Sequence, residues 1–369
     1  MQRYEIITNF AHMTEGVKNI ECLSLFFTAG VALGTVLVTP SAGLLLPFLA
    51  LPFFLQKRMI RWPEEVSVGL LLATFLLLGI FCARSAALPV ADEETSLEVF
   101  CASAAARVRA LIDAIPFPSQ GTAPLLKALL TGDRSSLSPE TVQVFRGSGA
   151  SHLLALSGLH MGILYLLFDY LTKALGNSPT ARRIRFGLIL GAAFFFTLMT
   201  GAGPSIVRAF LFIGLNETLR LLGRPRKAIR VFCVALLIQL ALDPGVIRSL
   251  GFQLSYLAMA GIFLLYPILE KWYPKGSRYN PLRWLWNTAA LSISCQVFTA
   301  PLAWLRFHTF PKYFLLTNLL ALPLTTALLS TAVVTILLSA AGLCPALLVT
   351  ATDGLGRLLL WVLEIICAM

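Results

Sequence analysis

Long apolar runs separated by short polar segments follow one another along most of the chain. The first three lie at residues 22–38, 41–55 and 66–83, and further runs extend from residue 151 to residue 366. Most are roughly 15 to 25 residues long, which is the length of helix that crosses the hydrocarbon core of a bilayer. The pattern predicts an all-α fold: a polytopic bundle of about ten or eleven transmembrane helices, some of them broken or re-entrant.

Lysine and arginine gather in the segments that join the apolar runs. They cluster at residues 57–61, 173–185, 220–230 and 271–283. Basic loops stay on the cytoplasmic side of a membrane, so these clusters indicate the orientation of the helices. We therefore predict that residues 84–149 lie outside and that the loop at residues 173–185 lies inside.

The division of the chain follows from the same pattern. Residues 1–83 form an N-terminal region with about three membrane helices, residues 84–120 an outer linker, and residues 121–369 one further membrane domain. A helix is predicted at residues 97–115 of the linker, with Arg107 and Arg109 on its polar face. It is either an interfacial amphipathic helix on the outer leaflet or a linker helix packed on the bundle.

The most distinctive stretch of the chain is TGDRSSLSPETVQVFRGSGASHLLALSGLHMGILY, at residues 131–165. Ser138 and Pro139 are typical of a helix start, and that short helix is predicted to end at a Gly-Ser-Gly break. Asp133 and Arg134 precede it on the outer side. They form either a capped turn with a local ion pair, or an entrance at which Arg134 contacts phosphate while Asp133 fixes the turn.

One continuous hydrophobic helix is predicted at residues 151–171, and it carries His152, Ser157 and His160. The three polar side chains fall within an arc of roughly 140° on such a helix. They could line a polar pathway or hydrogen-bond to neighbouring helices. Alternatively, Ser157 and a histidine could form a nucleophile and its base, although the sequence lacks the first glycine of a G-x-S-x-G elbow.

Gly158 and Gly162 form a G-x-x-x-G pair in this helix. Such a pair lets a neighbouring membrane helix approach closely. We therefore predict that the two glycines pack against another helix.

Further polar residues stand at the ends of later apolar runs. Arg208 lies about one turn into a span and either snorkels to the interface or contacts phosphate. Gln253 and Ser255 indicate a broken or re-entrant helix, or else bond between helices. His308 is a candidate for a lone capping residue, and Asn318 stands where an outer loop enters a span.

Composition agrees with a membrane protein: 57% of the 369 residues are hydrophobic and 13% are charged. The net charge of +11 is explained largely by the basic cytoplasmic loops. Seven scattered cysteines without a C-x-x-C pair, and four histidines without metal-ligand spacing, predict neither a disulfide framework nor a metal site. No cofactor is expected, and no catalytic residue is assigned.

Four ordered motifs resemble one family. The first consists of GDRSSLSPE together with FRGSGASHLLALSGLHMG, and the three that follow are GPSIVRAFLF, DPGVIRSLGFQLSYLAMAGI and APLAWLRFHTFPKYFLLTNLLALPL. Together they resemble the ComEC-type competence membrane proteins, the inner-membrane channels of natural DNA uptake. The residues singled out as pathway or motif positions are Asp133, Arg134, His152, Ser157, His160, Arg208, Gln253, Ser255, His308 and Asn318, with Gly158 and Gly162 in helix packing.

The resemblance implies an inner-membrane channel for single-stranded DNA that is not itself an enzyme. It also implies three partners: a surface DNA receptor, a separate nuclease and a cytosolic helicase or translocase. The last of these would supply the energy, because no G-x-x-x-x-G-K-[ST] motif occurs in this chain. The OB-type and nuclease domains that many family members carry are not expected within these residues. The alternative is an intramembrane hydrolase or a small-molecule transporter on the same bundle.

Overall fold

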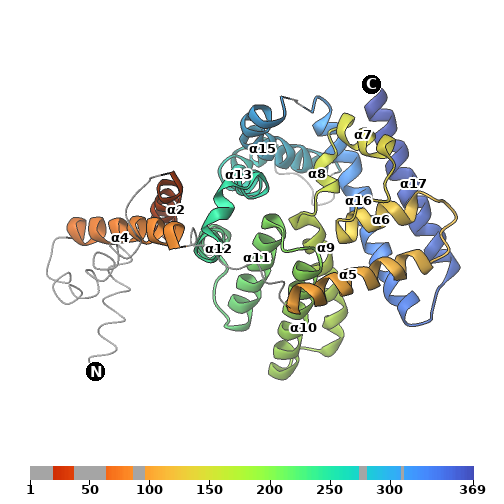
Figure 1. Cartoon of the computed structure of the whole chain (residues 1–369), viewed down its shortest axis with the longest axis horizontal. Helices are drawn as coiled ribbons and strands as arrows, with labels where there is room; N and C mark the ends of the chain where they lie inside the picture. The colour runs from red at the N-terminus through yellow and green to blue at the C-terminus, as the bar shows by residue number, and fades with distance from the viewer. Residues whose placement is uncertain (1–19, 37–63, 86–95, 274–280, 309–310) are drawn as a thin grey trace. The chain divides into compact units, whose positions relative to one another are not determined.

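The regular elements of the computed structural model are all helices within the residues it describes, which are 20–36, 64–85, 96–273, 281–308 and 311–369 (Figure 1). The predicted all-α class is confirmed. In chain order the elements are α2 (Ile20–Val36), α4 (Glu64–Ser85), α5 (Ser96–Ala114), α6 (Thr122–Thr131), α7 (Pro139–Gly147), α8 (Ser151–Leu154), α9 (Gly158–Thr172), η2 (Lys173–Leu175), α10 (Pro179–Met199), α11 (Pro204–Leu221), α12 (Ala228–Leu242), η3 (Pro244–Arg248), α13 (Leu250–Leu264), α14 (Tyr266–Glu270), α15 (Pro281–Phe307), α16 (Phe314–Ala340) and α17 (Ala346–Ala368).

Five segments in the described part of the chain are long and apolar enough to cross a membrane. They are Val68–Ser85, Leu250–Glu270, Leu282–Phe307, Phe314–Ala340 and Ala346–Ala368. The helices α2 and α12 are apolar but shorter. The predicted run at residues 41–55 lies outside the described residues, so the total of about ten or eleven spans stays a prediction.

The chain forms two compact units. The first is drawn from Met1–Glu93 and Gly214–Phe252, and the second from Glu94–Ile213 and Gln253–Met369. The sequence of each unit is therefore discontinuous, and both α11 and α13 contain a boundary between the units.

Glycines bring α2 and α4 together in the first unit. A Cβ atom on Gly30 would overlap the carbonyl oxygen of Leu76, and one on Gly79 would overlap that of Phe27. Because both obstacles are backbone atoms, neither position accepts a side chain without a shift of the helices. Small residues at a close helix crossing are typical of packing in membranes, where the hydrophobic effect does not drive helices together.

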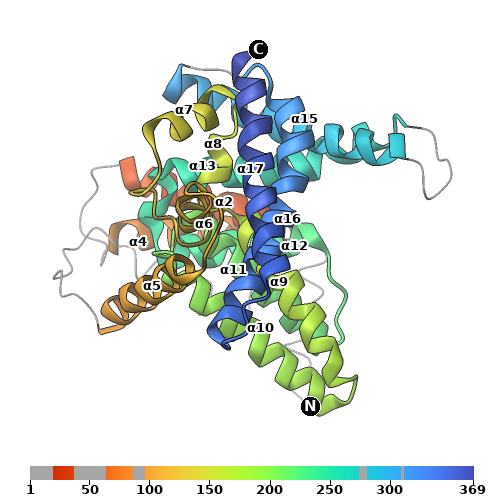
Figure 2. The same cartoon turned by 90° about the vertical axis from the view of Figure 1, so that its right-hand side faces the viewer.

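The main core of the second unit is made chiefly by α6, α7, α8, α16 and α17, with single buried residues from α5 and α9. Its fully buried side chains include Leu125, Leu126, Leu129, Phe145, Leu153, Leu328, Leu329, Leu359 and Leu363. The long helices α16 and α17 lie side by side in both views (Figure 1, Figure 2). Within this pair the hydroxyl groups of Thr335 and Thr352 are 3.1 Å apart and share a hydrogen bond, which satisfies two polar groups in an apolar environment.

The helix predicted at residues 97–115 is confirmed as α5. Its residues Ala104, Ala105 and Ile112 are buried, and α5 packs against α6, α10 and α16. One face of the linker helix is therefore packed on the bundle. Contact of its remaining surface with the outer leaflet stays a prediction.

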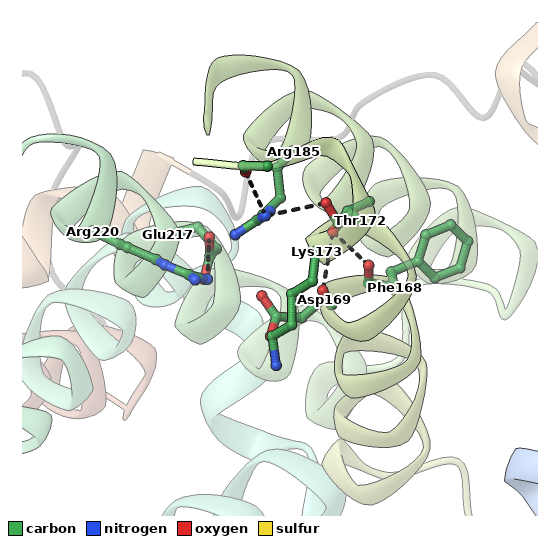
Figure 3. A network of polar contacts seen from close by, with 8 residues as sticks. Phe168, Asp169, Thr172, Lys173, Arg185, Glu217 and Arg220 are labelled. Carbon is green, nitrogen blue, oxygen red and sulfur yellow. Dashed lines mark hydrogen bonds and ion pairs between the residues drawn. The ribbon is translucent and has the colours of Figure 1, made fainter. Parts of the chain in front are cut away.

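The basic segment at residues 173–185 is not a loop throughout, because α10 begins at Pro179 with Ser178 as its N-cap. Arg185 is buried, and its Nη2 donates hydrogen bonds of 3.1 Å to the carbonyl oxygens of Thr172 and Gly176 (Figure 3). Arg185 thus satisfies two carbonyls at the end of α9. A cation at a helix C-terminus is also favoured by the helix dipole.

Candidate functional site at the break in the central helix

The prediction of a single continuous helix at residues 151–171 is wrong. The chain forms the short helix α8, leaves the helical conformation from Ala155 to Ser157, and resumes as α9 at Gly158. Ala155 and Ser157 are extended, with ψ angles of 123° and 170°. The break therefore places an additional helix N-terminus within the second unit.

A capping box stabilises the start of α9. The Ser157 hydroxyl accepts a hydrogen bond from the Leu159 amide at 3.3 Å, and His160 Nδ1 accepts one from the Ser157 amide at 3.2 Å. This reciprocal pairing satisfies amides that a helix N-terminus leaves free. The sequence pattern could not show it, because the surrounding residues are apolar enough to continue a helix.

The capping box also decides where His160 carries its proton. Because Nδ1 accepts the amide proton of Ser157, the neutral imidazole has its own proton on Nε2. The side chain is only 3% exposed, and Nε2 has no hydrogen-bond partner among the described residues. His160 thus presents a buried donor that the described structure leaves unsatisfied.

The Gly-Asp-Arg turn supports the break from the other side. Arg134 Nη2 donates a 2.7 Å hydrogen bond to the carbonyl oxygen of Leu154, the last residue of α8. Gly132 has a φ angle of 79°, and a Cβ there would come within 2.7 Å of the Leu156 side chain. The turn therefore holds the two residues that flank Ala155, which is a structural role for Arg134.

Asp133 has local partners. Its Oδ1 accepts hydrogen bonds from the Ser135 amide at 3.0 Å and the Ser135 hydroxyl at 2.6 Å, and its Oδ2 is 3.5 Å from Arg109 Nε. The hydrogen bond from the Ser135 hydroxyl contributes most to lowering the pKa of Asp133 below its usual value. The capped turn is seen, but the ion-pair partner of Asp133 is Arg109 of α5 and not a residue of the turn itself. A phosphate contact by Arg134 stays a prediction.

Arg208 of α11 meets the first residue of α9. Its Nη2 lies 3.4 Å from the position that a Cβ on Gly158 would occupy, and the guanidinium carbon is 5.7 Å from the centre of the Tyr256 ring. The Nη1 atom is buried and has no hydrogen-bond partner within the described chain. The structure thus brings Ser157, His160 and Arg208 to the beginning of one helix.

The second glycine of the predicted packing pair does not take part. Among the described residues, no atom of a neighbouring element lies within 4 Å of a Cβ placed on Gly162, whereas Gly158 faces Arg208 and Ala209. The expected close approach at Gly162 is therefore wrong. A close crossing in this unit occurs elsewhere: a Cβ on Gly261 of α13 would overlap the carbonyl oxygen of Ser294 on α15.

The remaining predicted residues are distributed over other elements. His152 is exposed, with Nδ1 3.2 Å from the Gly149 carbonyl oxygen, and His308 is exposed beyond the end of α15 with a φ angle of 52°. Gln253 and Ser255 are half-buried on α13. Asn318 lies on α16, and its buried Oδ1 has no partner in the part of the chain described.

Sequence reasoning missed Asp353 of α17. This residue is 2% exposed, and its Oδ1 accepts hydrogen bonds from the Thr122 hydroxyl at 2.6 Å, from the Ser119 amide at 3.2 Å and from the Ser119 hydroxyl. It therefore joins the first residue of α6 and the segment before it to a distant helix, although the N-cap of α6, Gly121, has no side-chain hydrogen bond. An aspartate within an apolar run was the signal, since ionisable residues in such runs are rare and have partners.

A comparison with protein families agrees with the resemblance to competence membrane proteins that the sequence motifs indicate. The family model described as "Competence protein" matches residues 129–369. These contain the whole broken-helix site, by which we mean Ser157, Gly158, His160, Arg208 and the supporting turn at Gly132–Arg134. No solved structure matches the chain.

Several curated proteins are similar to part of this chain. "ComE operon protein 3" of Bacillus subtilis is 29% identical over 202 residues, which are 55% of this chain and 24% of that protein. "Competence protein ComA" of Neisseria gonorrhoeae is 31% identical over 174 residues, 46% of this chain and 25% of that protein. "Recombination protein 2" of Haemophilus influenzae is 26% identical over 214 residues, 56% of this chain and 27% of that protein. The matched region thus covers about a quarter of each relative's length.

Proposed function

The chain belongs to the Competence protein family, and from this premise we propose that it forms an inner-membrane channel through which single-stranded DNA enters the cell during natural transformation. The observation that carries the proposal is the family match over residues 129–369, which contain four of the five membrane-length segments and the whole broken-helix site. Family membership and helices of membrane length support a membrane protein. That the protein forms a channel, that single-stranded DNA passes through it and that it lies in the inner membrane are proposals.

The site supplies the kind of chemistry that a nucleic-acid pathway requires. A strand carries one negative charge per phosphate, and its passage is favoured by cations and by polar groups that exclude lipid. Arg208 and the first turn of α9 offer positive potential, and Tyr256 offers an aromatic ring beside it. None of these groups reads sequence, as expected for a pathway that accepts any strand.

The energy for transport would come from other proteins. No G-x-x-x-x-G-K-[ST] motif occurs in these 369 residues. We therefore propose a separate cytosolic helicase or translocase that pulls the strand, together with a surface receptor and a nuclease that prepare it.

Transformation provides the test of the channel. Deletion of the gene should abolish transformation by added DNA while DNA still binds at the cell surface, and a plasmid copy should restore it. Transport of labelled DNA into the cytosol, measured by protection from added nuclease, should fail in the same strain. Transformation at the parental frequency in the deletion strain would contradict the proposal.

One contact favours a second candidate function, an intramembrane hydrolase. Ser157 Oγ and His160 Nδ1 are 3.1 Å apart, a distance suited to a nucleophile and its base. The capping box accounts for the same contact, and the Ser157 amide already occupies Nδ1. If Ser157 is only a cap, Ser157→Ala should reduce transformation modestly at equal membrane abundance. A Ser157→Ala protein that is abundant but inactive would favour the hydrolase.

A further inference from the structure

Arg208 is a cation without a counter-charge in the described structure. It lies about one turn into α11, its Nη1 atom is buried without a hydrogen-bond partner, and no ion pair between described residues includes it. A buried charge that lacks a partner is strongly destabilising. The arrangement therefore favours an anion from outside the chain.

Two features of the first turn of α9 also favour an anion, the helix dipole beside Arg208 and the unsatisfied donor of His160. Arg208 Nη2 lies 3.4 Å from the Cβ position of Gly158, the first residue of α9, where the helix dipole adds positive potential. In the first turn of the same helix, the His160 side chain is only 3% exposed, and its Nε2–H has no partner among the described residues. Both observations are independent of the charge on Arg208.

We propose that Arg208, the first turn of α9 and His160 Nε2 form a binding site for a phosphate group. The guanidinium fork matches the oxygens of phosphate, and the Tyr256 ring beside it at 5.7 Å restricts its orientation. The site is occupied either by a free phosphate ion or by a phosphodiester of the transported strand. The second assignment rests on the proposed channel function, whereas the anion site itself does not.

The first experiment tests the anion site on the purified full chain in detergent. Inorganic phosphate should raise the melting temperature more than sodium chloride of equal ionic strength, because it binds the folded state. Arg208→Gln should abolish this additional rise. Arg226→Gln removes an exposed arginine from the loop after α11 and should leave the rise unchanged. An equal rise in wild type and Arg208→Gln would overturn the site.

A second variant keeps the test decisive if Arg208→Gln is not recovered folded. Arg208→Lys retains the charge but loses the fork, so we expect phosphate to bind at least about tenfold more weakly. His160→Phe removes the second donor while keeping a ring of similar size, and it should also weaken phosphate binding. Unchanged phosphate affinity in both variants would overturn the site.

The third experiment decides between the two sources of phosphate. A fluorescent oligothymidylate should bind the wild-type chain and compete with inorganic phosphate, and a methylphosphonate oligomer of equal length, which lacks the charge, should not. Binding of inorganic phosphate without competition by the oligonucleotide would overturn the strand assignment. If the deletion strain transforms normally but phosphate binding still depends on Arg208, the channel proposal fails and the anion site remains valid.

Discussion

Asp353 concentrates three hydrogen bonds on one carboxylate oxygen. The donors are the Ser119 amide, the Ser119 hydroxyl and the Thr122 hydroxyl, all at the beginning of α6. Hydrogen bonds to a charged acceptor contribute about 1.5 to 3 kcal/mol each, and buried donors left without an acceptor are costly. One residue of α17 therefore determines whether these three donors are satisfied.

We predict that Asp353→Ala lowers the melting temperature of the purified chain more than Asp353→Asn does. Asparagine keeps an acceptor oxygen in the same place, whereas alanine leaves the donors unsatisfied. Glu364→Ala is the control, since it removes an exposed acid from the same helix and should have little effect. Equal destabilisation by Asp353→Ala and Glu364→Ala would show that these three hydrogen bonds contribute nothing to stability.

Ser157 and His160 form the second residue-scale determinant, through the capping box of α9. Loss of an N-cap side chain costs about 1 kcal/mol. We expect Ser157→Ala to reduce the melting temperature slightly, and Ser157→Asp to retain it, because aspartate is also a good cap. Thermal unfolding of the two variants at equal detergent concentration is the measurement; a larger loss for aspartate would argue against the capping role.

Among the elements, α9 differs along its length in how closely its neighbours approach. Gly158 faces Arg208 and Ala209, and Gly162 faces no atom of another element within 4 Å in the described structure. The two glycines, although one helical turn apart, therefore carry different constraints.

We predict that Gly158→Leu severely reduces transformation at equal membrane abundance and that Gly162→Leu is mild. The leucine at residue 158 must displace the Arg208 guanidinium, whereas the one at residue 162 enters free space. Comparable losses in both variants would mean that close packing of the whole G-x-x-x-G face, rather than the Arg208 contact, limits function.

The helices α2 and α4 allow the same comparison in the first unit. Gly79→Ala should destabilise the pair, because its Cβ overlaps the carbonyl oxygen of Phe27. Gly69→Ala on the same helix meets no atom of the described residues within 4 Å. Limited proteolysis of membranes that contain each variant measures the difference. Faster cleavage of Gly69→Ala than of Gly79→Ala would contradict the crossing.

At the scale of the whole molecule, orientation in the membrane follows from the basic segments. We predict that a cysteine in place of exposed Gln120 reacts with a membrane-impermeant maleimide on intact cells, and that one in place of exposed Asn177 reacts only after permeabilisation. The exposed native Cys22, Cys344 and Cys367 are replaced by serine beforehand. Labelling of both positions on intact cells would overturn the proposed orientation.

The sequence by itself determined the helical class and the individual helix starts that have strong local signals. Apolar runs predicted membrane-length helices such as α16 and α17, and Ser138-Pro139 predicted the start of α7. The helix at residues 97–115 was found within one residue at each end. These features depend on composition and on neighbours along the chain, and a sequence displays both directly.

Tertiary structure alone decided which polar residues meet. The break before Ser157 is supported by Gly132 and Arg134, more than twenty residues earlier, and the neighbours of Arg208 come from α9 and α13. In a membrane protein, the faces that contact lipid and the faces that contact other helices are both apolar. Periodicity therefore cannot distinguish the two, and the open surroundings of Gly162 and the partners of Arg185 and Asp353 became visible only once the helices were packed.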